Sequence, residues 1–204
     1  MQHYEELAKE LLKIGAIQVK TDTYFTWTSG IKSPIYCDNR LTMSYPSIRE
    51  KISEQFLKMI EVMGIQPDVI AGTATAGIPH AAWLSDRLQI PMIYVRSKPK
   101  THGKGNQIEG AYEKGQNVLV IEDLISTGMS SIDAANALID EGLNVLDVYA
   151  IFTYGLNKAQ EQFERAGLSH HTILTFDEIL DVLLSEGNVS KDEVESLLAW
   201  RNHL

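Results

Sequence analysis

Apolar residues recur at helical spacing in two stretches near the start of the chain. Side chains three or four positions apart line one face of a helix, so each stretch predicts an amphipathic helix. Gly15 ends the first pattern. The apolar positions are Tyr4, Leu7, Leu11 and Ile14 in the first stretch, and Ile48, Ile52, Phe56, Met59 and Met63 in the second.

From residue 68 onward, short apolar runs alternate with further helical patterns. The runs are nearly continuous in apolar residues, which is typical of parallel strands buried on both faces. Their alternation with helices predicts an α/β fold with a mostly parallel, twisted sheet flanked by helices. Strands are predicted at 68–71, 91–95, 117–121, 145–152 and 172–174, and helices at 78–88, 130–141, 156–166, 177–185 and 191–202.

Composition narrows the class of protein. The chain has 204 residues, which predicts one domain. It contains 27 acidic residues against 18 Lys and Arg, a net charge of −9, which argues against a broad nucleic-acid or membrane-binding surface. An anionic ligand would therefore need a local cluster of cations. One cysteine, Cys37, fits a reducing compartment, and no signal-peptide or membrane-span pattern is evident, so we expect a cytoplasmic protein.

Three loops follow predicted strands, at the edge where parallel α/β sheets bind ligands. In the most informative one, Glu122 and Asp123 come directly after an apolar run, and Ser126, Thr127 and Gly128 precede a helix. Hydroxyls and main-chain N–H groups at a helix N-terminus bind anions, whereas carboxylates suit sugar hydroxyls. Together they indicate a phosphorylated sugar; the alternative is a pair of solvated acids beside an ordinary helix cap.

The second loop, residues 96–105, is rich in basic side chains and contains no acid. It is the local cation cluster that the net charge calls for, and Gly103 and Gly105 would let it move as a lid. The third loop, 72–77, has small residues that permit close ligand approach through main-chain N–H groups. The alternatives are a solvated charged loop and an ordinary strand-to-helix turn.

The motif IEDLISTG at 121–128 resembles the phosphoribosyl-pyrophosphate (PRPP) motif of the type I phosphoribosyltransferases. The segment FTWTSGIKSPIYCD at 25–38 and the loop carrying Arg96, Lys100 and His102 resemble the orotate branch, in its Gram-positive form. The resemblance implies one domain over 1–204. An N-terminal helix and base-covering hood would occupy about 1–45, a PRPP-binding core about 46–175, and C-terminal helices about 176–204.

The resemblance also implies roles for individual residues. Arg96, Lys100 and His102 would be catalytic and meet pyrophosphate, and Ser126 would also sit beside orotate. The residues implied to bind PRPP are Arg96, Lys100, His102, Glu122, Asp123, Leu124, Ile125, Ser126, Thr127, Gly128, Met129 and Ser130. The implied pyrophosphate loop comprises Thr73, Ala74, Thr75, Ala76 and Gly77.

The implied reaction transfers the phosphoribosyl group of PRPP to N1 of orotate, giving orotidine 5′-monophosphate and pyrophosphate. Mg²⁺ would enter with PRPP and be held mainly by its oxygens, without a dedicated protein metal site. The implied assembly is a homodimer in which the basic loop reaches the partner subunit's site, with no nucleic-acid or membrane partner.

Several positions depart from the enterobacterial form of the family. Thr28 and Ala76 stand in place of lysines, Ser97 replaces the second residue of an Arg-Lys pair, and Tyr154 stands where an arginine contacts orotate. The orotate carboxylate would then meet main-chain N–H groups of 29–33, or Lys32. Three alternatives stay open: a purine phosphoribosyltransferase, a PRPP-sensing regulator, and a general sugar-phosphate binder.

Other conspicuous side chains have structural interpretations. We expect His80 to pack within its helix and Cys37 to be buried. His170 and His171 are expected in a surface turn. Trp200 is expected either to pack its helix against the body or to form a dimer contact.

Overall fold

The computed structural model describes residues 2–26, 30, 32–98 and 107–204. Its helices are α1 (Gln2–Lys13), α2 (Pro46–Met63), α3 (Gly77–Leu88), α4 (Met129–Asp140), α5 (Asn157–Ala166), α6 (Phe176–Ser185), α7 (Lys191–Asn202) and the 3-10 helix η1 (Asn39–Ser44). Its strands are β1 (Ile17–Val19), β2 (Phe25–Thr26), β3 (Lys32–Ser33), β4 (Ile35–Cys37), β5 (Val69–Thr73), β6 (Met92–Val95), β7 (Ile108–Glu109), β8 (Asn117–Ile125), β9 (Asn144–Thr153) and β10 (His170–Thr175).

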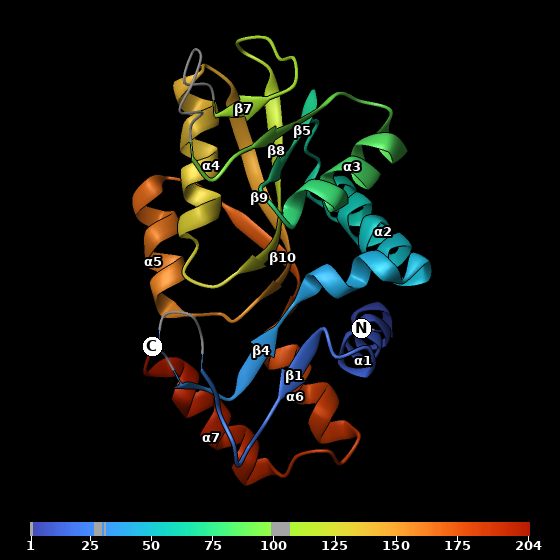
Figure 1. The fold of residues 1–204 in the computed structure, drawn as a ribbon, viewed down its shortest axis with the longest axis vertical. Helices are drawn as coiled ribbons and strands as arrows, with labels where there is room; N and C mark the ends of the chain where they lie inside the picture. Colours follow the sequence, from blue (N-terminus) through green and yellow to red (C-terminus); the bar gives the residue numbers. More distant parts are fainter. Residues whose placement is uncertain (1, 27–29, 31, 99–106) are drawn as a thin grey trace.

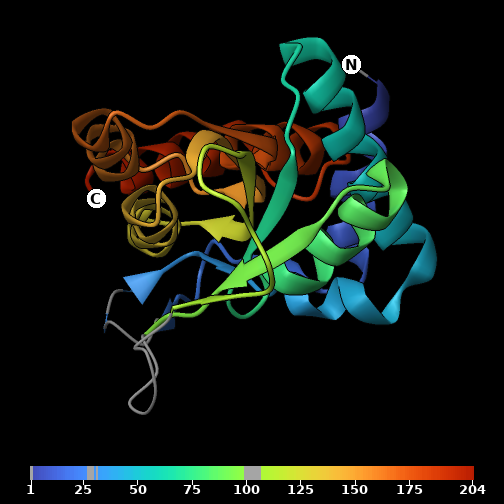
Figure 2. The same cartoon turned by 90° about the horizontal axis from the view of Figure 1, so that it is seen from above.

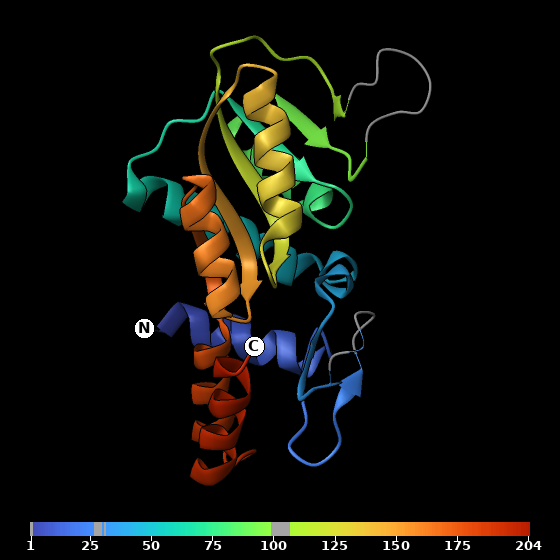
Figure 3. The same ribbon diagram turned by 90° about the vertical axis from the view of Figure 1, so that its left-hand side faces the viewer.

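A six-stranded sheet forms the centre of the molecule, with strand order β10-β9-β8-β5-β6-β7 (Figure 1). All its pairs are parallel except β6 with β7. Helices α4 and α5 cover one face of the sheet, and α2 and α3 cover the other (Figures 2 and 3). The predicted α/β fold with a mostly parallel sheet is therefore confirmed.

The central parts of the middle strands are apolar because both of their faces are buried. In β8, Leu119 and Ile121 belong to the core cluster on one face of the sheet, whereas Val118 and Val120 belong to the cluster on the other. Successive side chains of a strand point to opposite faces, so each face receives every second residue. This explains why the runs lack the polar alternation of a half-exposed strand.

The strand predicted at 117–121 is four residues longer in the structure. β8 continues to Ile125 because β9 runs beside it to Thr153, with Glu122 opposite Ala150 and Ile125 opposite Thr153. Glu122 and Asp123 thus lie within the last part of the strand, where the ladder fixes their backbone, and not in the loop after it.

The N-terminal segment, whose Ser-Gly and Ser-Pro pairs indicate tight turns between short extended pieces, forms two small antiparallel sheets, β1-β4 and β2-β3. Together with α1, α6 and α7 they lie at the opposite end of the molecule from β7 (Figure 1). The Trp200 indole N–H donates to the Lys32 carbonyl oxygen at 3.0 Å, and its ring meets Phe176 edge-on. Trp200 therefore packs α7 against the body, as one of its two predicted roles required.

The prediction of a surface turn at His170 and His171 was wrong. Both residues begin β10, where His170 pairs with Val148 and His171 with Tyr149. The His170 ring stacks on Phe163, with centroids 4.2 Å apart, and His171 Nδ1 lies 2.9 Å from the buried carboxylate of Asp147. The polar character of the two histidines suggested a turn, but strand pairing and these contacts place both residues in β10.

No helix in the described part of the chain has the length and apolar character that crossing a membrane requires.

Candidate active site

Two adjoining cavities lie beyond the carboxyl ends of β5, β6 and β8, the neighbouring strands that the predicted loops follow. Their volumes are about 320 and 230 Å³, and Ala74 and Ser130 line both. The larger, which we call the acid-pair cavity, is lined by Cys37, Asp38, Arg40, Ala74, Thr75, Ala76, Glu122, Asp123, Leu124 and Ser130. The smaller is lined by Thr73, Ala74, Val95, Arg96, Ser97, Gln107, Ser130, Asp133 and Ala134.

Glu122 is a buried acid with a defined hydrogen-bond environment. Its side chain is 4% exposed, and its Oε2 accepts from the hydroxyls of Ser130 at 3.2 Å and Ser131 at 3.3 Å. Its Oε1 accepts from the main-chain N–H of Asp123 at 3.0 Å. Burial, followed by the neighbouring Asp123 carboxylate, raises the pKa of Glu122 well above its ordinary value.

Asp123 is the second acid of the pair and is partly exposed. Burial raises its pKa, while the Arg40 guanidinium acts in the opposite direction. Three donors occupy the Glu122 oxygens, and the side chains of the two acids also interact with each other. Asp123 is the more exposed of the two and therefore the acid that a ligand in the cavity reaches more readily.

The turn from β8 into α4 has the geometry of an anion site. Gly128 occupies the N-cap of α4 with φ +82°, a conformation that favours glycine. A Cβ there would lie 2.7 Å from Phe163 Cε2. Ser126 and Thr127 are partly exposed beside it, and Met129 and Ser130 are exposed on the first turn. Leu124 lines the acid-pair cavity, whereas the Ile125 side chain is buried in the core.

The turn from β5 into α3 lies against the strand that carries the acid pair. A Cβ on Gly77 would overlap the Ile121 carbonyl oxygen, so only glycine fits this approach. The Ala74–Thr75 peptide bond is cis. The hydroxyl of Thr73 is buried at the edge of the smaller cavity, with no hydrogen-bond partner among the described residues. It is thus a donor available to a ligand oxygen.

Of the predicted catalytic cations, the structure places Arg96. Its side chain lines the smaller cavity, with Nη1 3.8 Å from Glu109 Oε1. Its main chain is tied to Gln107 by an N–H donated at 2.9 Å and a carbonyl that accepts from the Gln107 amide at 2.8 Å. Lys100 and His102 lie outside the described residues, as does Thr28.

Of the residues considered for orotate contact, Lys32 is exposed and Tyr154 lies in the core. The Lys32 ammonium donates to Thr26 Oγ1 at 2.9 Å and is exposed. Tyr154 is 3% exposed, and burial raises its pKa far above the ordinary value. Cys37 is buried, as expected, although it also contributes to the wall of the acid-pair cavity.

The sequence interpretation missed Arg40 and Asn39. Arg40 lines the acid-pair cavity, and the Asn39 amide donates to the Asp123 carbonyl oxygen at 2.7 Å. Asp38, Asn39 and Arg40 follow one another directly after the SGIKSPIYC segment. This run of three polar residues after Ile35, Tyr36 and Cys37 was the available signal.

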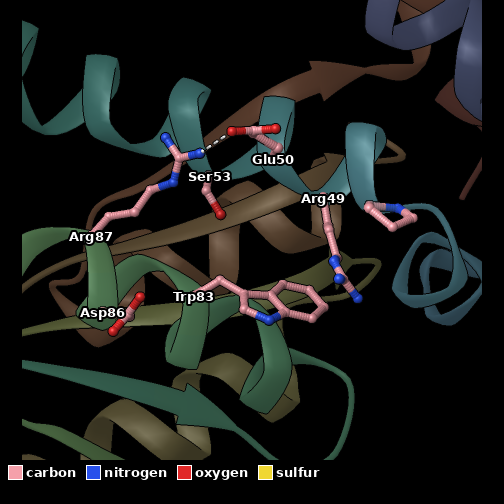
Figure 4. Close-up of a pocket in the computed structure, with 7 residues that line it drawn as sticks. Arg49, Glu50, Ser53, Trp83, Asp86 and Arg87 are labelled. Carbon is pink, nitrogen blue, oxygen red and sulfur yellow. Dashed lines mark hydrogen bonds and ion pairs between the residues drawn. The ribbon is translucent and has the colours of Figure 1, made fainter.

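A further groove of about 270 Å³ lies between α2 and α3 (Figure 4). Arg87 Nη2 is 3.0 Å from Glu50 Oε1 there, and the Arg49 guanidinium lies 4.9 Å from the Trp83 ring centroid. The groove lacks the strand-end acid pair and the glycine turns. His80 is buried at its side, as predicted, and burial lowers its pKa to about 4. The two strand-end cavities are therefore the candidate active site.

Comparison with known proteins identifies the family to which the chain belongs. A family model described as "Phosphoribosyl transferase domain" matches residues 44–169. The chain is 60% identical over 200 residues to an orotate phosphoribosyltransferase of Oceanobacillus iheyensis, covering 98% of this chain and 99% of that protein. It is 55% identical to one of Fusobacterium nucleatum, covering 98% and 95%. The crystal structure of orotate phosphoribosyltransferase from Aeropyrum pernix superposes with a TM-score of 0.77 at 30% identity, covering 90% of this chain and 99% of that chain.

Proposed function

The chain belongs to the orotate phosphoribosyltransferases, within the phosphoribosyl transferase domain family, and from that premise we propose how its residues carry out the transfer. PRPP and orotate are the substrates, and orotidine 5′-monophosphate and pyrophosphate are the products, in a step of pyrimidine biosynthesis. The observation that carries the proposal is the acid pair Glu122 and Asp123 beside the glycine turn into α4, in one cavity with the 73–77 loop.

Ribose and phosphate bind at the end of β8. Asp123 accepts hydrogen bonds from ribose hydroxyls, and Glu122, fixed by Ser130 and Ser131, completes the pair. The 5′-phosphate lies against the 126–130 turn, where main-chain N–H groups and the helix dipole of α4 stabilise its charge. Leu124 and Ile125 contribute main-chain positions that lead into this turn. Ser126 lies at the junction of phosphate and orotate.

Pyrophosphate lies against the 73–77 loop where the two cavities adjoin, at Ala74 and Ser130, with Arg96 on the side of the smaller cavity. Negative charge grows on this leaving group as the bond to ribose C1 breaks. Fixed cations and main-chain N–H groups aimed at it stabilise the transition state more than the ground state. Arg96 lines the smaller cavity, and Lys100 and His102 follow Arg96 in the sequence of the basic loop. Lys100 is proposed as the largest cationic contribution, and His102 as a donor to the departing pyrophosphate.

Mg²⁺ fits this donor set as a companion of PRPP. Asp123 offers a carboxylate at the cavity wall, while the Glu122 oxygens are already hydrogen-bonded. Mg²⁺ keeps several waters and favours phosphate oxygens, so most of its ligands would come from PRPP and water. Its chemical contribution is to offset charge on the pyrophosphate.

The proposed assembly is a homodimer in which the basic loop of one subunit serves the partner's site. The exposed apolar side chains of Leu41, Met43 and Tyr45, next to the start of α2, support a subunit contact on this face. The acidic chain with its single cysteine supports a cytoplasmic location.

A base panel tests the proposed function. The purified protein with PRPP and Mg²⁺ is given orotate, adenine, hypoxanthine or guanine, and pyrophosphate release is measured. The proposal expects release with orotate alone. Release with a purine and none with orotate would establish the purine alternative, and release with no base would contradict both.

A further inference from the structure

One cation in the acid-pair cavity has no role in the reaction described above. The guanidinium of Arg40 lines this cavity together with three carboxylates, those of Asp38, Glu122 and Asp123. Among the described residues that line it, Arg40 is the only Lys or Arg. A polyanion entering here would be repelled by the acids, so the placement of this one cation matters for binding.

The Arg40 side chain is held in a fixed orientation by its neighbour two residues earlier. Its Nε lies 2.6 Å from Asp38 Oδ1 and its Nη2 2.9 Å from Asp38 Oδ2, a two-pronged contact. The Arg40 main-chain N–H also donates to Asp38 Oδ1 at 3.2 Å. Such a fork uses two of the five N–H donors of a guanidinium, which leaves the others for an anion.

The segment that carries Arg40 is anchored to the acid pair. Asn39, the preceding residue, is fully buried, and its amide donates to the Asp123 carbonyl oxygen at 2.7 Å. The Asn39 carbonyl in turn accepts from the Thr42 hydroxyl at 2.5 Å. The position of the guanidinium relative to Asp123 is therefore set by the fold, although the side chain itself is exposed.

The wall that includes the 73–77 loop carries no charged side chain. Ala74, Thr75 and Ala76 line the acid-pair cavity and offer only main-chain groups and one hydroxyl to a ligand. Arg40 is thus placed to supply, from the N-terminal segment, the side-chain cation that this loop lacks. The pyrophosphate of PRPP is the part of the substrate with the charge to require it.

We propose that Arg40 binds the pyrophosphate group of PRPP and that Asp38 is the positioning residue that holds its guanidinium toward the cavity. This inference rests on the proposed function, because it takes PRPP as the ligand of the acid-pair cavity.

The test compares Arg40→Gln with Arg165→Gln. Arg165 is a matched control because it is an exposed arginine paired with one acid, Glu161, on α5. Steady-state kinetics give KM for PRPP, KM for orotate and kcat, and calorimetry gives the Kd for inorganic pyrophosphate with Mg²⁺. For Arg40→Gln we expect KM for PRPP and Kd for pyrophosphate to rise at least about tenfold, the effect of one lost charge-assisted contact, with KM for orotate unchanged. Arg165→Gln should match the wild type in all four quantities.

Asp38→Asn separates positioning from binding. It should raise KM for PRPP less than Arg40→Gln does, and in the Arg40→Gln background it should add little, because the guanidinium it positions is already gone. Circular dichroism and thermal unfolding verify that each variant is folded.

Unchanged pyrophosphate affinity and unchanged KM for PRPP in folded Arg40→Gln would overturn the inference. A rise in KM for orotate alone would also overturn it, because Arg40 would then face the base. If the wild type fails to consume orotate, the proposed function fails, while the pyrophosphate titration still decides the role of Arg40.

Discussion

The Asn39 side-chain amide donates a hydrogen bond to the main-chain carbonyl oxygen of Asp123, across 84 positions of sequence. The donor belongs to η1, at the end of the N-terminal segment, and the acceptor belongs to the last part of β8. One contact thus joins the predicted base-covering segment to the acid pair that we assign to the ribose.

Replacing Asn39 with Ala should loosen this connection. The change removes a fully buried donor, so the free energy of unfolding should fall by about 1–3 kcal/mol. KM for PRPP should rise because the Asp123 backbone loses its partner. Thermal unfolding and steady-state kinetics measure the two effects. Asn136→Ala, at an exposed position of α4, is the control and should change neither.

Replacing Gly77 with Ala should force α3 away from β8. The new Cβ would overlap the Ile121 carbonyl oxygen and lie 3.2 Å from Glu122 Cα, so the backbone must shift beside the acid pair. Overpacking of this kind costs about 1–3 kcal/mol. We expect a lower Tm together with weaker PRPP binding by calorimetry.

Gly187→Ala is the comparison for Gly77→Ala. Gly187 has φ +72°, and a Cβ added there would have nothing within 4 Å, so its substitution costs only the backbone strain of about 1–2 kcal/mol. It should lower Tm while leaving PRPP affinity intact. Equal loss of PRPP affinity in both variants would contradict a local effect of Gly77 on the site.

Replacing Glu122 with Gln should change how stability depends on pH. The pKa of Glu122 is raised in the folded protein above its ordinary value of 4.5, chiefly by burial. As pH rises above 4.5 the unfolded chain therefore loses this proton first, and stability declines until the folded pKa is passed. Gln has no proton to lose, so this part of the decline should disappear.

The measurement for Glu122→Gln is denaturant unfolding at a series of pH values. Between about pH 4 and neutral pH, the free energy of unfolding should decline less in the variant than in the wild type. The affinity of the variant for PRPP should fall. Glu161→Gln, on the exposed surface of α5, should leave the pH profile as it is in the wild type. If the free energy of unfolding of Glu122→Gln depended on pH as it does in the wild type, the pKa of Glu122 would not be raised in the folded protein.

Mixing two impaired variants tests the shared basic loop. Lys100→Ala damages the loop and should lower kcat at least about tenfold, and Asp123→Asn damages the ribose site. If each loop serves the partner's site, a mixed dimer contains one site with neither defect. Random exchange makes half of the dimers mixed, so about a quarter of wild-type activity should return.

The activity of the reassorted mixture is compared with that of each variant alone at the same total concentration. If the loop serves its own subunit, every site in a mixed dimer carries one defect, and mixing restores nothing. Sedimentation velocity establishes that the mixture is dimeric.

Much of the central sheet was predictable because its strands are near-continuous apolar runs. Val118 to Ile121 had to be buried on both faces, and the helices on either side follow from their periodicity. The continuation of β8 through Glu122 and Asp123 was not predictable, since two adjacent acids resemble a strand end. The parallel pairing with β9 that extends the strand is a tertiary effect.

The acid pair, the glycine turn at Gly128 and the 73–77 loop were predictable as candidate site residues because each lies at or after the end of a strand of one parallel sheet. Arg40 and Asn39 were not, because the place of Arg40 in the cavity and the contact of Asn39 with Asp123 depend on η1 folding back over β8 from a distant part of the chain. Likewise, His170 and His171 look like a polar turn until Phe163 and Asp147 are brought against them.

We propose that a phosphoribosyl group passes from PRPP to orotate in the acid-pair cavity. The most direct test of this proposal follows the ultraviolet absorbance of orotate after PRPP and Mg²⁺ are added to the wild-type protein, with pyrophosphate measured in parallel. We expect a loss of orotate absorbance that requires both PRPP and Mg²⁺ and is matched mole for mole by pyrophosphate. Unchanged orotate absorbance with folded, PRPP-binding protein would contradict the proposal.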